Sequence, residues 1–208
     1  IGIDPGYGML PREYAAPADA IVDSKKIIDL TAAMNADGRL KWDVPADKWT
    51  ILRIGHTPTG AVNAPSPDSG RGLEVDKLSR EAFDRFWAGG MQKLLDRLGP
   101  LVGRSLKNVL IDSYEVGSQN WTKRFRAEFE KRRGYDLGRF FPALAGRVVD
   151  DVASTEAFYY DFRRTIADLF AENYYDYFAE KCHQAGLLAS IEPYDGPFEC
   201  LLSGRSAD

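Results

Sequence analysis

Two short apolar runs that each end in acidic residues constrain the fold of this chain more than any other feature. The first, "NVLIDSYE", spans residues 108–115, and the second, "LLASIEPY", spans residues 187–194. A continuous apolar run of this length is typical of a strand that is covered on both faces, as the strands of parallel sheets are. Helical patterns separate the two runs, so we expect crossover connections and parallel strands.

Three helices are expected around these strands. Ser79 can cap a helix that continues through "EAFDRFWAGGMQKLLDRL", because a serine oxygen can accept a hydrogen bond from a free amide of the first turn. A second helix is predicted over about residues 122–133, with Gly134 as its C-terminal cap. A third, long helix is predicted over about residues 154–184 from apolar residues at helical spacing.

The first part of the chain differs from the rest in composition and pattern. Residues 1–20 are rich in proline, glycine and alanine and predict an irregular connection. Residues 21–57 contain β-prone runs such as "KWTILRIGHT", separated by turn signals, and predict three or four antiparallel strands in a small sheet. Residues 135–152 lie between the second and third predicted helices, and we expect them to form a surface excursion.

Composition excludes several classes of protein. Of the 208 residues, 44% are hydrophobic and 12% aromatic, which is enough for a sizeable core. The formal net charge of −4 does not indicate the excess of positive charge that binds nucleic acid or an anionic membrane. The chain contains no apolar run as long as a membrane span and no signal-peptide layout at its start. Cys182 and Cys200 have no metal-site spacing, so two unpaired thiols are expected.

The strand ends carry the chemistry that the sequence predicts. In parallel α/β barrels the active site is assembled at the carboxyl ends of several strands. Glu115 and Glu192, from two different strands, would face one mouth, and paired carboxylates serve glycoside hydrolysis as proton donor and as base or nucleophile. Asp112 could keep Glu115 protonated through its negative charge. One such carboxylate is often part of a structural ion pair, but its repetition at two strand ends favours function.

Groups suited to binding a sugar surround these carboxylates. Aromatic rings can stack on a pyranose and amides can bind its hydroxyl groups, whereas a structural histidine is the simpler explanation of His56. The candidate substrate-binding residues are Asp112, Gln119, Asn120, Trp121, Tyr194 and His56.

Several ordered blocks of the chain resemble glycoside hydrolase family 106, the α-L-rhamnosidases. They include "LKWDVPADKWTILRIGHTPTG", "GRGLEVDKLS", "LKNVLIDSYEVGSQNWT", "DFRRTIADLFAENYY" and "EPYDGPFE". The resemblance extends from Lys25 to Glu199. It implies hydrolysis of terminal α-L-rhamnose with inversion, a carbohydrate substrate, a bound calcium ion, and an extracellular or periplasmic location.

The resemblance also implies a fold and residue roles. The fold would be a partial (β/α)8 TIM-type barrel over residues 66–208, preceded by the β-rich segment within residues 1–65, which would be an insertion or accessory sheet. Glu115 matches the general acid. Glu192 would be the second catalytic carboxylate, a calcium ligand or a sugar-binding group. The family's further glutamate, after the "GPF" block, is expected beyond Asp208, so we expect this piece of a larger polypeptide to be inactive alone.

Two other functions remain open from the sequence. A non-catalytic carbohydrate-binding or structural piece would use the carboxylates only to hold sugar or metal. Another barrel glycosidase, such as a β-galactosidase-like enzyme, would also place a glutamate at a strand end. A carboxylate separation of roughly 6.5–9.5 Å would indicate inversion, and one near 5 Å would indicate retention.

Overall fold

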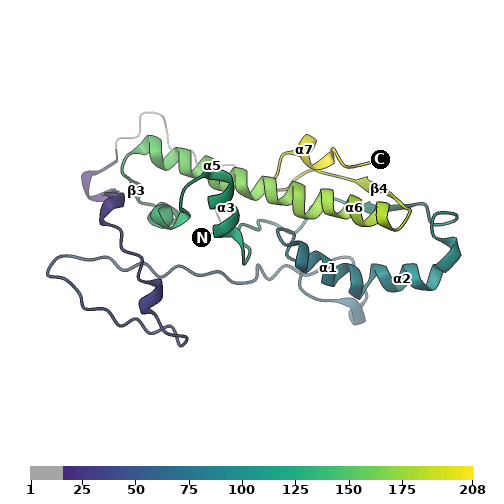
Figure 1. Ribbon diagram of the computed structural model, residues 1–208, viewed down its shortest axis with the longest axis horizontal. Helices are drawn as coiled ribbons and strands as arrows, with labels where there is room; N and C mark the ends of the chain where they lie inside the picture. The colour runs from purple at the N-terminus through teal and green to yellow at the C-terminus, as the bar shows by residue number, and fades with distance from the viewer. Residues whose placement is uncertain (1–15) are drawn as a thin grey trace.

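The structure is a computed structural model that describes residues 16–208. The irregular connection predicted for residues 1–20 therefore lies outside the described residues as far as residue 15. The strands are β1 (Ile21–Val22), β2 (Asn108–Ile111), β3 (Val148–Val149) and β4 (Leu188–Ile191). The helices are α1 (Arg80–Gly89), α2 (Met91–Leu98), α3 (Phe125–Arg133), α4 (Phe141–Leu144), α5 (Val152–Phe170), α6 (Asp176–Gln184) and α7 (Cys200–Gly204). Figure 1 shows an elongated body with α5 and α6 along its length.

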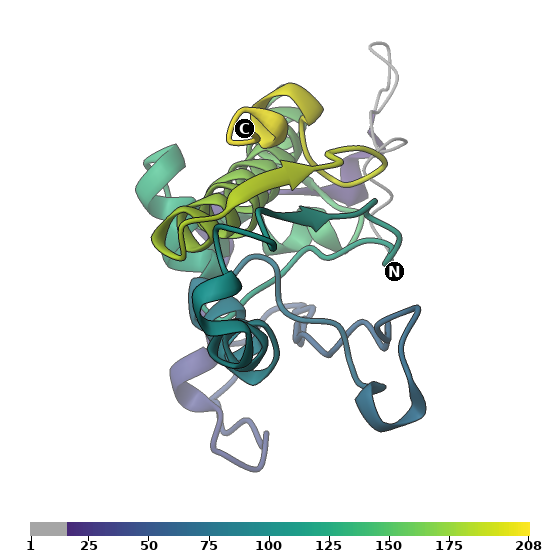
Figure 2. The same cartoon turned by 90° about the vertical axis from the view of Figure 1, so that its right-hand side faces the viewer.

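The strands of residues 16–208 form two separate parallel pairs. β2 pairs with β4 in the register Asn108↔Leu188 to Ile111↔Ile191, and β1 pairs with β3. Figure 2 shows β2 and β4 side by side, pointing the same way. The predicted parallel α/β layout is confirmed, whereas a partial barrel stays a prediction. The expectation of cover on both faces is wrong, because Leu110 is 54% and Leu188 53% exposed.

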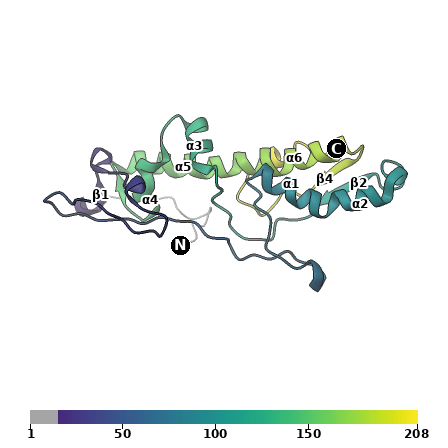
Figure 3. The same cartoon turned by 60° about the horizontal axis from the view of Figure 1, so that its bottom comes forward.

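The predicted antiparallel sheet over residues 21–57 is wrong. In the part of the chain that the structure describes, the β-structure of this stretch is limited to β1 and an isolated antiparallel bridge between Met34 and Leu40. The segment runs along the outside of the helical body (Figures 1 and 3) and exposes Val44 and Ile51 by 59% and 57%. Residues that favour the strand conformation form a sheet only when a second strand lies beside them. No described strand lies beside residues 41–57. The division of the chain at residue 65 stays a prediction.

The single helix predicted from Ser79 to residue 98 is two helices, α1 and α2, which meet at Gly90. The other predicted helices are confirmed. The hydroxyl oxygen of Ser79 accepts a hydrogen bond of 3.2 Å from the amide of Ala82. The cap of α3, Gly134, has φ +80°, a conformation that glycine adopts without a steric penalty. No helix among residues 16–208 is long and apolar enough to cross a membrane.

Residues 135–152 are part of the core and not a surface excursion. They form a 3-10 turn over Leu137–Phe140, then α4 and β3. Leu137 and Val149 are fully buried. The glycines and Pro142 of this stretch suggested a loop, but its apolar side chains are buried against α3 and α5.

Within the described part of the chain, two hydrophobic cores lie along the same long helical rod. The first core gathers around Phe125, Phe129 and Phe158, and the second around Phe83, Phe178 and Leu187. α5 contributes to the first core and α6 to the second. A π-helical segment, Ala171–Tyr175, joins the two helices.

An ion pair attaches this π-helical segment to α3. The two terminal nitrogens of Arg132 donate to the two carboxylate oxygens of Glu172 at 2.8 Å and 2.7 Å. These hydrogen bonds lower the pKa of Glu172 below its ordinary value of 4.5. The ionised carboxylate therefore stabilises the fold above about pH 4.5, and this contribution is lost as the pH falls through the lower folded pKa.

Glu172→Gln is expected to lower the melting temperature of the full-length protein by a few degrees at pH 7. The difference from wild type should shrink as the pH is lowered from 4.5 toward 3, because Glu172 then becomes protonated in the wild type as well. Glu180→Gln is the matched control, since the pair between Glu180 and Arg80 is exposed and spans 3.4 Å. Thermal melts at several pH values measure both, and a difference that does not depend on pH would contradict the assignment.

Candidate active site

The carboxyl ends of β2 and β4 place two acidic side chains next to each other. Because Ile111 pairs with Ile191, the residues that follow, Asp112 and Glu192, are neighbours across the strand pair. The amide of Glu192 also donates to the carbonyl of Ile111 at 3.0 Å. Hydrogen bonding with Asp112, lost hydration and the negative charge of Asp112 raise the pKa of Glu192. Two acidic residues next to each other at the ends of adjacent strands are a feature suited to acid–base chemistry.

Glu115 lies in the loop that directly follows β2. Its side chain is exposed and accepts a hydrogen bond of 2.9 Å from the hydroxyl of Ser113. Asp112 was expected to act on Glu115, but its carboxylate contacts the amide of Ser113, at 2.8 Å, and Glu192. The carboxylate whose pKa Asp112 raises is therefore Glu192.

Tyr114 anchors the loop that carries Glu115. Its side chain is buried, and its hydroxyl donates to the carbonyl of Gly117 at 2.6 Å. The ring meets Phe170 of α5 and Phe198 edge to face, with centroids 5.4 Å and 5.6 Å apart. Since Phe198 belongs to the loop after Glu192, one aromatic contact joins the loops that follow the two strands.

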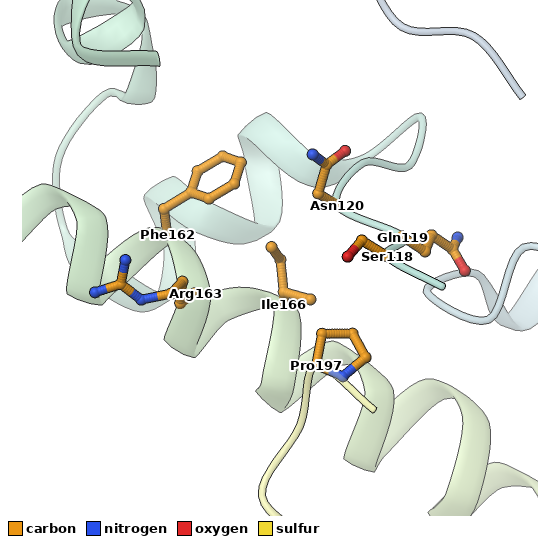
Figure 4. Close-up of a pocket in the computed structure, with 7 residues that line it drawn as sticks. All are labelled: Ser118, Gln119, Asn120, Phe162, Arg163, Ile166 and Pro197. Atoms are coloured by element: carbon orange, nitrogen blue, oxygen red, sulfur yellow. The ribbon is translucent and has the colours of Figure 1, made fainter. Parts of the chain in front are cut away.

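Gln119 and Asn120 lie next to each other in the loop after β2. The side chain of Gln119 donates to Asp76 and accepts from the amide of Lys77 at 3.2 Å, so both of its polar ends are occupied by the protein. Both residues line a small pocket whose other lining residues are Ser118, Phe162, Arg163, Ile166 and Pro197 (Figure 4). Its volume of about 20 Å³ holds a water molecule and not a pyranose.

The aromatic candidates divide into packed and exposed rings. Trp121 is half-buried and packs on Phe125 of the first core at 5.0 Å between centroids. His56 is exposed and stacks on Trp121 at 6.2 Å, with 29° between the ring planes. Tyr194 is 45% exposed, in the loop directly after β4. Among the aromatic candidates, Tyr194 and His56 are thus the exposed rings that a sugar could reach.

Glu74, Asp76 and Lys77, which the sequence indicates only as a salt-bridged cap before α1, hold this loop from behind. Asp76 accepts hydrogen bonds from Leu78, Gln119 and Thr122, and the buried Lys77 pairs with Glu74. The block "GRGLEVDKLS" contributed to the family resemblance. The run of charged residues that follows the two glycines of this block is the sequence signal that could have indicated these contacts.

The acidic side chains at the strand ends supply few ligands for a calcium ion. Calcium takes six to eight oxygen ligands. Residues 16–208 contain no group of three or more histidine, cysteine, aspartate or glutamate side chains placed to hold a metal ion. Asp112 and Glu192 supply two carboxyl groups, which are fewer ligands than a calcium ion takes.

Comparisons with known proteins all point to glycoside hydrolases. Residues 7–202 match the family of α-L-rhamnosidases designated glycoside hydrolase family 106. A curated protein of Formosa agariphila, provisionally named a beta-glucuronidase, is 52% identical over 200 residues, which cover 96% of this chain and 17% of that protein. The structure of a rhamnosidase from Novosphingobium sp. PP1Y matches with a TM-score of 0.76 and 32% identity over 89% of this chain and 18% of that one.

The chain spans less than a fifth of each of these relatives. The family match covers nearly all of the described residues, including both strand ends. The chain therefore belongs to glycoside hydrolase family 106, the family of the α-L-rhamnosidases.

Proposed function

We propose that this chain is the part of a longer glycoside hydrolase that presents the proton donor for hydrolysis of terminal α-L-rhamnosyl residues in glycosides and in oligo- or polysaccharides. One observation carries the proposal: two parallel strands end side by side, and the residues that follow them are the acids Asp112, Glu115 and Glu192. Family membership and the rhamnosidase from Novosphingobium sp. PP1Y support the choice of sugar.

The proposed mechanism uses two carboxyl groups. Glu115 protonates the glycosidic oxygen as the bond to the leaving group breaks. A second carboxylate, either Glu192 or a residue elsewhere in the longer protein, removes a proton from the attacking water. Inversion follows if that water attacks from the face opposite the leaving group. Calcium binding stays a separate proposal that rests on the family resemblance, and no step depends on it.

Charge supports a neutral sugar over an acidic one. None of the carboxylates of Asp112, Glu115 and Glu192 forms an ion pair with a described residue. A glucuronide would bring a further negative charge to this edge, where like charges repel. Rhamnose is a deoxyhexose without charge and avoids that cost. β-Glucuronide hydrolysis is the second candidate, because the relative from Formosa agariphila carries that name.

The test is a comparison of two substrates with the full-length wild-type protein. We expect hydrolysis of an aryl α-L-rhamnoside at least 100-fold faster than that of the matched aryl β-D-glucuronide. Proton NMR during the first turnovers should show β-L-rhamnose before mutarotation, as inversion requires. α-L-Rhamnose as the first product would indicate retention, and preference for the glucuronide would establish the second candidate. Binding of rhamnose without hydrolysis of either substrate would favour a carbohydrate-binding role.

A further inference from the structure

The segment Glu74–Leu78 lies behind the loop that carries Glu115, and we call it the clamp segment. We propose that Lys77 of this segment is a positioning residue: it fixes Tyr114 and, through Tyr114, the backbone that presents Glu115. The proposal rests on the proposed function, in which Glu115 is the proton donor.

Lys77 is a buried cation with defined partners. It is 5% exposed, and its ammonium nitrogen lies 2.5 Å from a carboxylate oxygen of Glu74. The same nitrogen lies 5.8 Å from the ring centroid of Tyr114 and 5.4 Å from that of Tyr174. A buried charge is costly unless it is paired, and a cation over two aromatic faces is attracted to both. Lys77 therefore restrains the ring of Tyr114 in one place.

Tyr114 transmits this restraint to Glu115. Its ring is held by Lys77, by Phe170 and by Phe198, and its hydroxyl is bound to the carbonyl of Gly117. Glu115 is the next residue, and the one described side chain that binds its carboxylate is Ser113. The placement of the Glu115 carboxyl group therefore depends on the backbone that Tyr114 fixes.

The clamp segment also holds the far end of the same loop. The carboxylate of Asp76 accepts from the amide of Gln119 and, at 2.7 Å, from the hydroxyl of the buried Thr122. Gln119 in turn accepts from the backbone amide of Lys77 at 3.2 Å. Both ends of the loop, at Tyr114 and at residues 119–122, are thus attached to adjacent residues of one segment. A change at the clamp is expected to move the loop without touching substrate.

The test compares Lys77→Met with Lys181→Met in the full-length protein. Both lysines form an ion pair and lie over a tyrosine ring, but Lys181 pairs with Asp84 of α1 at 2.6 Å and lies 5.1 Å from the ring centroid of Tyr177. We expect Lys77→Met to lower kcat for the aryl α-L-rhamnoside by roughly 10- to 100-fold, because small displacements of a catalytic group cost this much. KM should stay within about 3-fold of wild type, and Lys181→Met should stay within about 3-fold in both constants.

Hydrogen exchange separates positioning from general loss of stability. The amides of residues 113–117 should exchange faster in Lys77→Met than in wild type, while those of α3 stay unchanged. Lys77→Arg, which keeps the charge over the rings, should restore kcat to within about 3-fold of wild type. An unchanged kcat in Lys77→Met, or equal losses in Lys77→Met and Lys181→Met, would overturn the proposal.

A milder variant covers the case in which Lys77→Met does not fold. Glu74→Gln removes the partner of Lys77 at a partly exposed side chain and should lower kcat several-fold with unchanged KM. No effect of Glu74→Gln on kcat and on exchange of residues 113–117 would then overturn the proposal. If the wild type hydrolyses the glucuronide and not the rhamnoside, the choice of sugar fails, and the same comparison of kcat is made on the glucuronide.

Discussion

Glu115→Gln is expected to lower kcat/KM for an aryl α-L-rhamnoside by about 10²- to 10⁴-fold, the usual contribution of a general acid. Glutamine keeps the shape of the side chain and can still accept a hydrogen bond from Ser113, so the fold should be retained. The loss should be larger for a poor leaving group such as methylumbelliferone than for dinitrophenol. A good leaving group departs with little protonation, so this dependence identifies the proton donor.

Glu130→Gln is the matched control for this experiment. Glu130 is an exposed glutamate on α3, and its substitution should leave kcat/KM within about 2-fold of wild type. Equal melting temperatures of the variants and wild type would show that the fold is intact. Full activity of Glu115→Gln, or a loss that is equal for both leaving groups, would remove Glu115 from the role of acid.

Glu192→Gln is expected to lower kcat/KM at least 100-fold, mainly through kcat, if Glu192 supplies the base. Its pKa is raised by the hydrogen bond to Asp112, which brings the group closer to the pH at which an acid–base catalyst works best. Added azide should restore turnover, because azide attacks the sugar without giving up a proton. Kinetics with and without azide, together with the configuration of the glycosyl azide, measure this.

Other outcomes would assign Glu192 a different role. A rise in KM with kcat nearly unchanged would make it a sugar-binding group. Recovery of activity at high calcium, together with weaker calcium binding by calorimetry, would make it a metal ligand. Wild-type kinetics in Glu192→Gln would make the carboxyl pair at the strand ends structural and place the base elsewhere in the longer protein.

Features with local causes could be predicted from the sequence. The cap at Ser79, the left-handed glycine after α3 and the apolar runs of β2 and β4 each carry their signal within a few residues. The parallel order of β2 and β4 followed from the helices between them. The proximity of the two strand ends followed in turn from that order.

Features with distant causes could not be predicted. Whether "KWTILRIGHT" becomes a strand depends on a partner backbone, which no local pattern specifies. The burial of Leu137 and Val149 depends on helices that lie elsewhere in the chain. Likewise, Asp112 is three residues from Glu115 in sequence, yet the acid whose pKa it raises is Glu192. The pairing of β2 with β4 brings these two residues together, although they are far apart in the sequence.

The π-helical segment between α5 and α6 determines how the two cores are oriented about one rod. A π turn holds one residue more than an α turn, and each residue of an α-helix rotates the next side chain by about 100°. If residues 152–184 formed one regular α-helix, the side chains of α6 would be rotated by about that angle relative to α5. Phe178 and Cys182, both buried in the second core, would then point elsewhere. The π turn thus rotates the apolar face of α6 relative to that of α5. One continuous rod can therefore pack against two cores that do not lie along a single stripe of its surface.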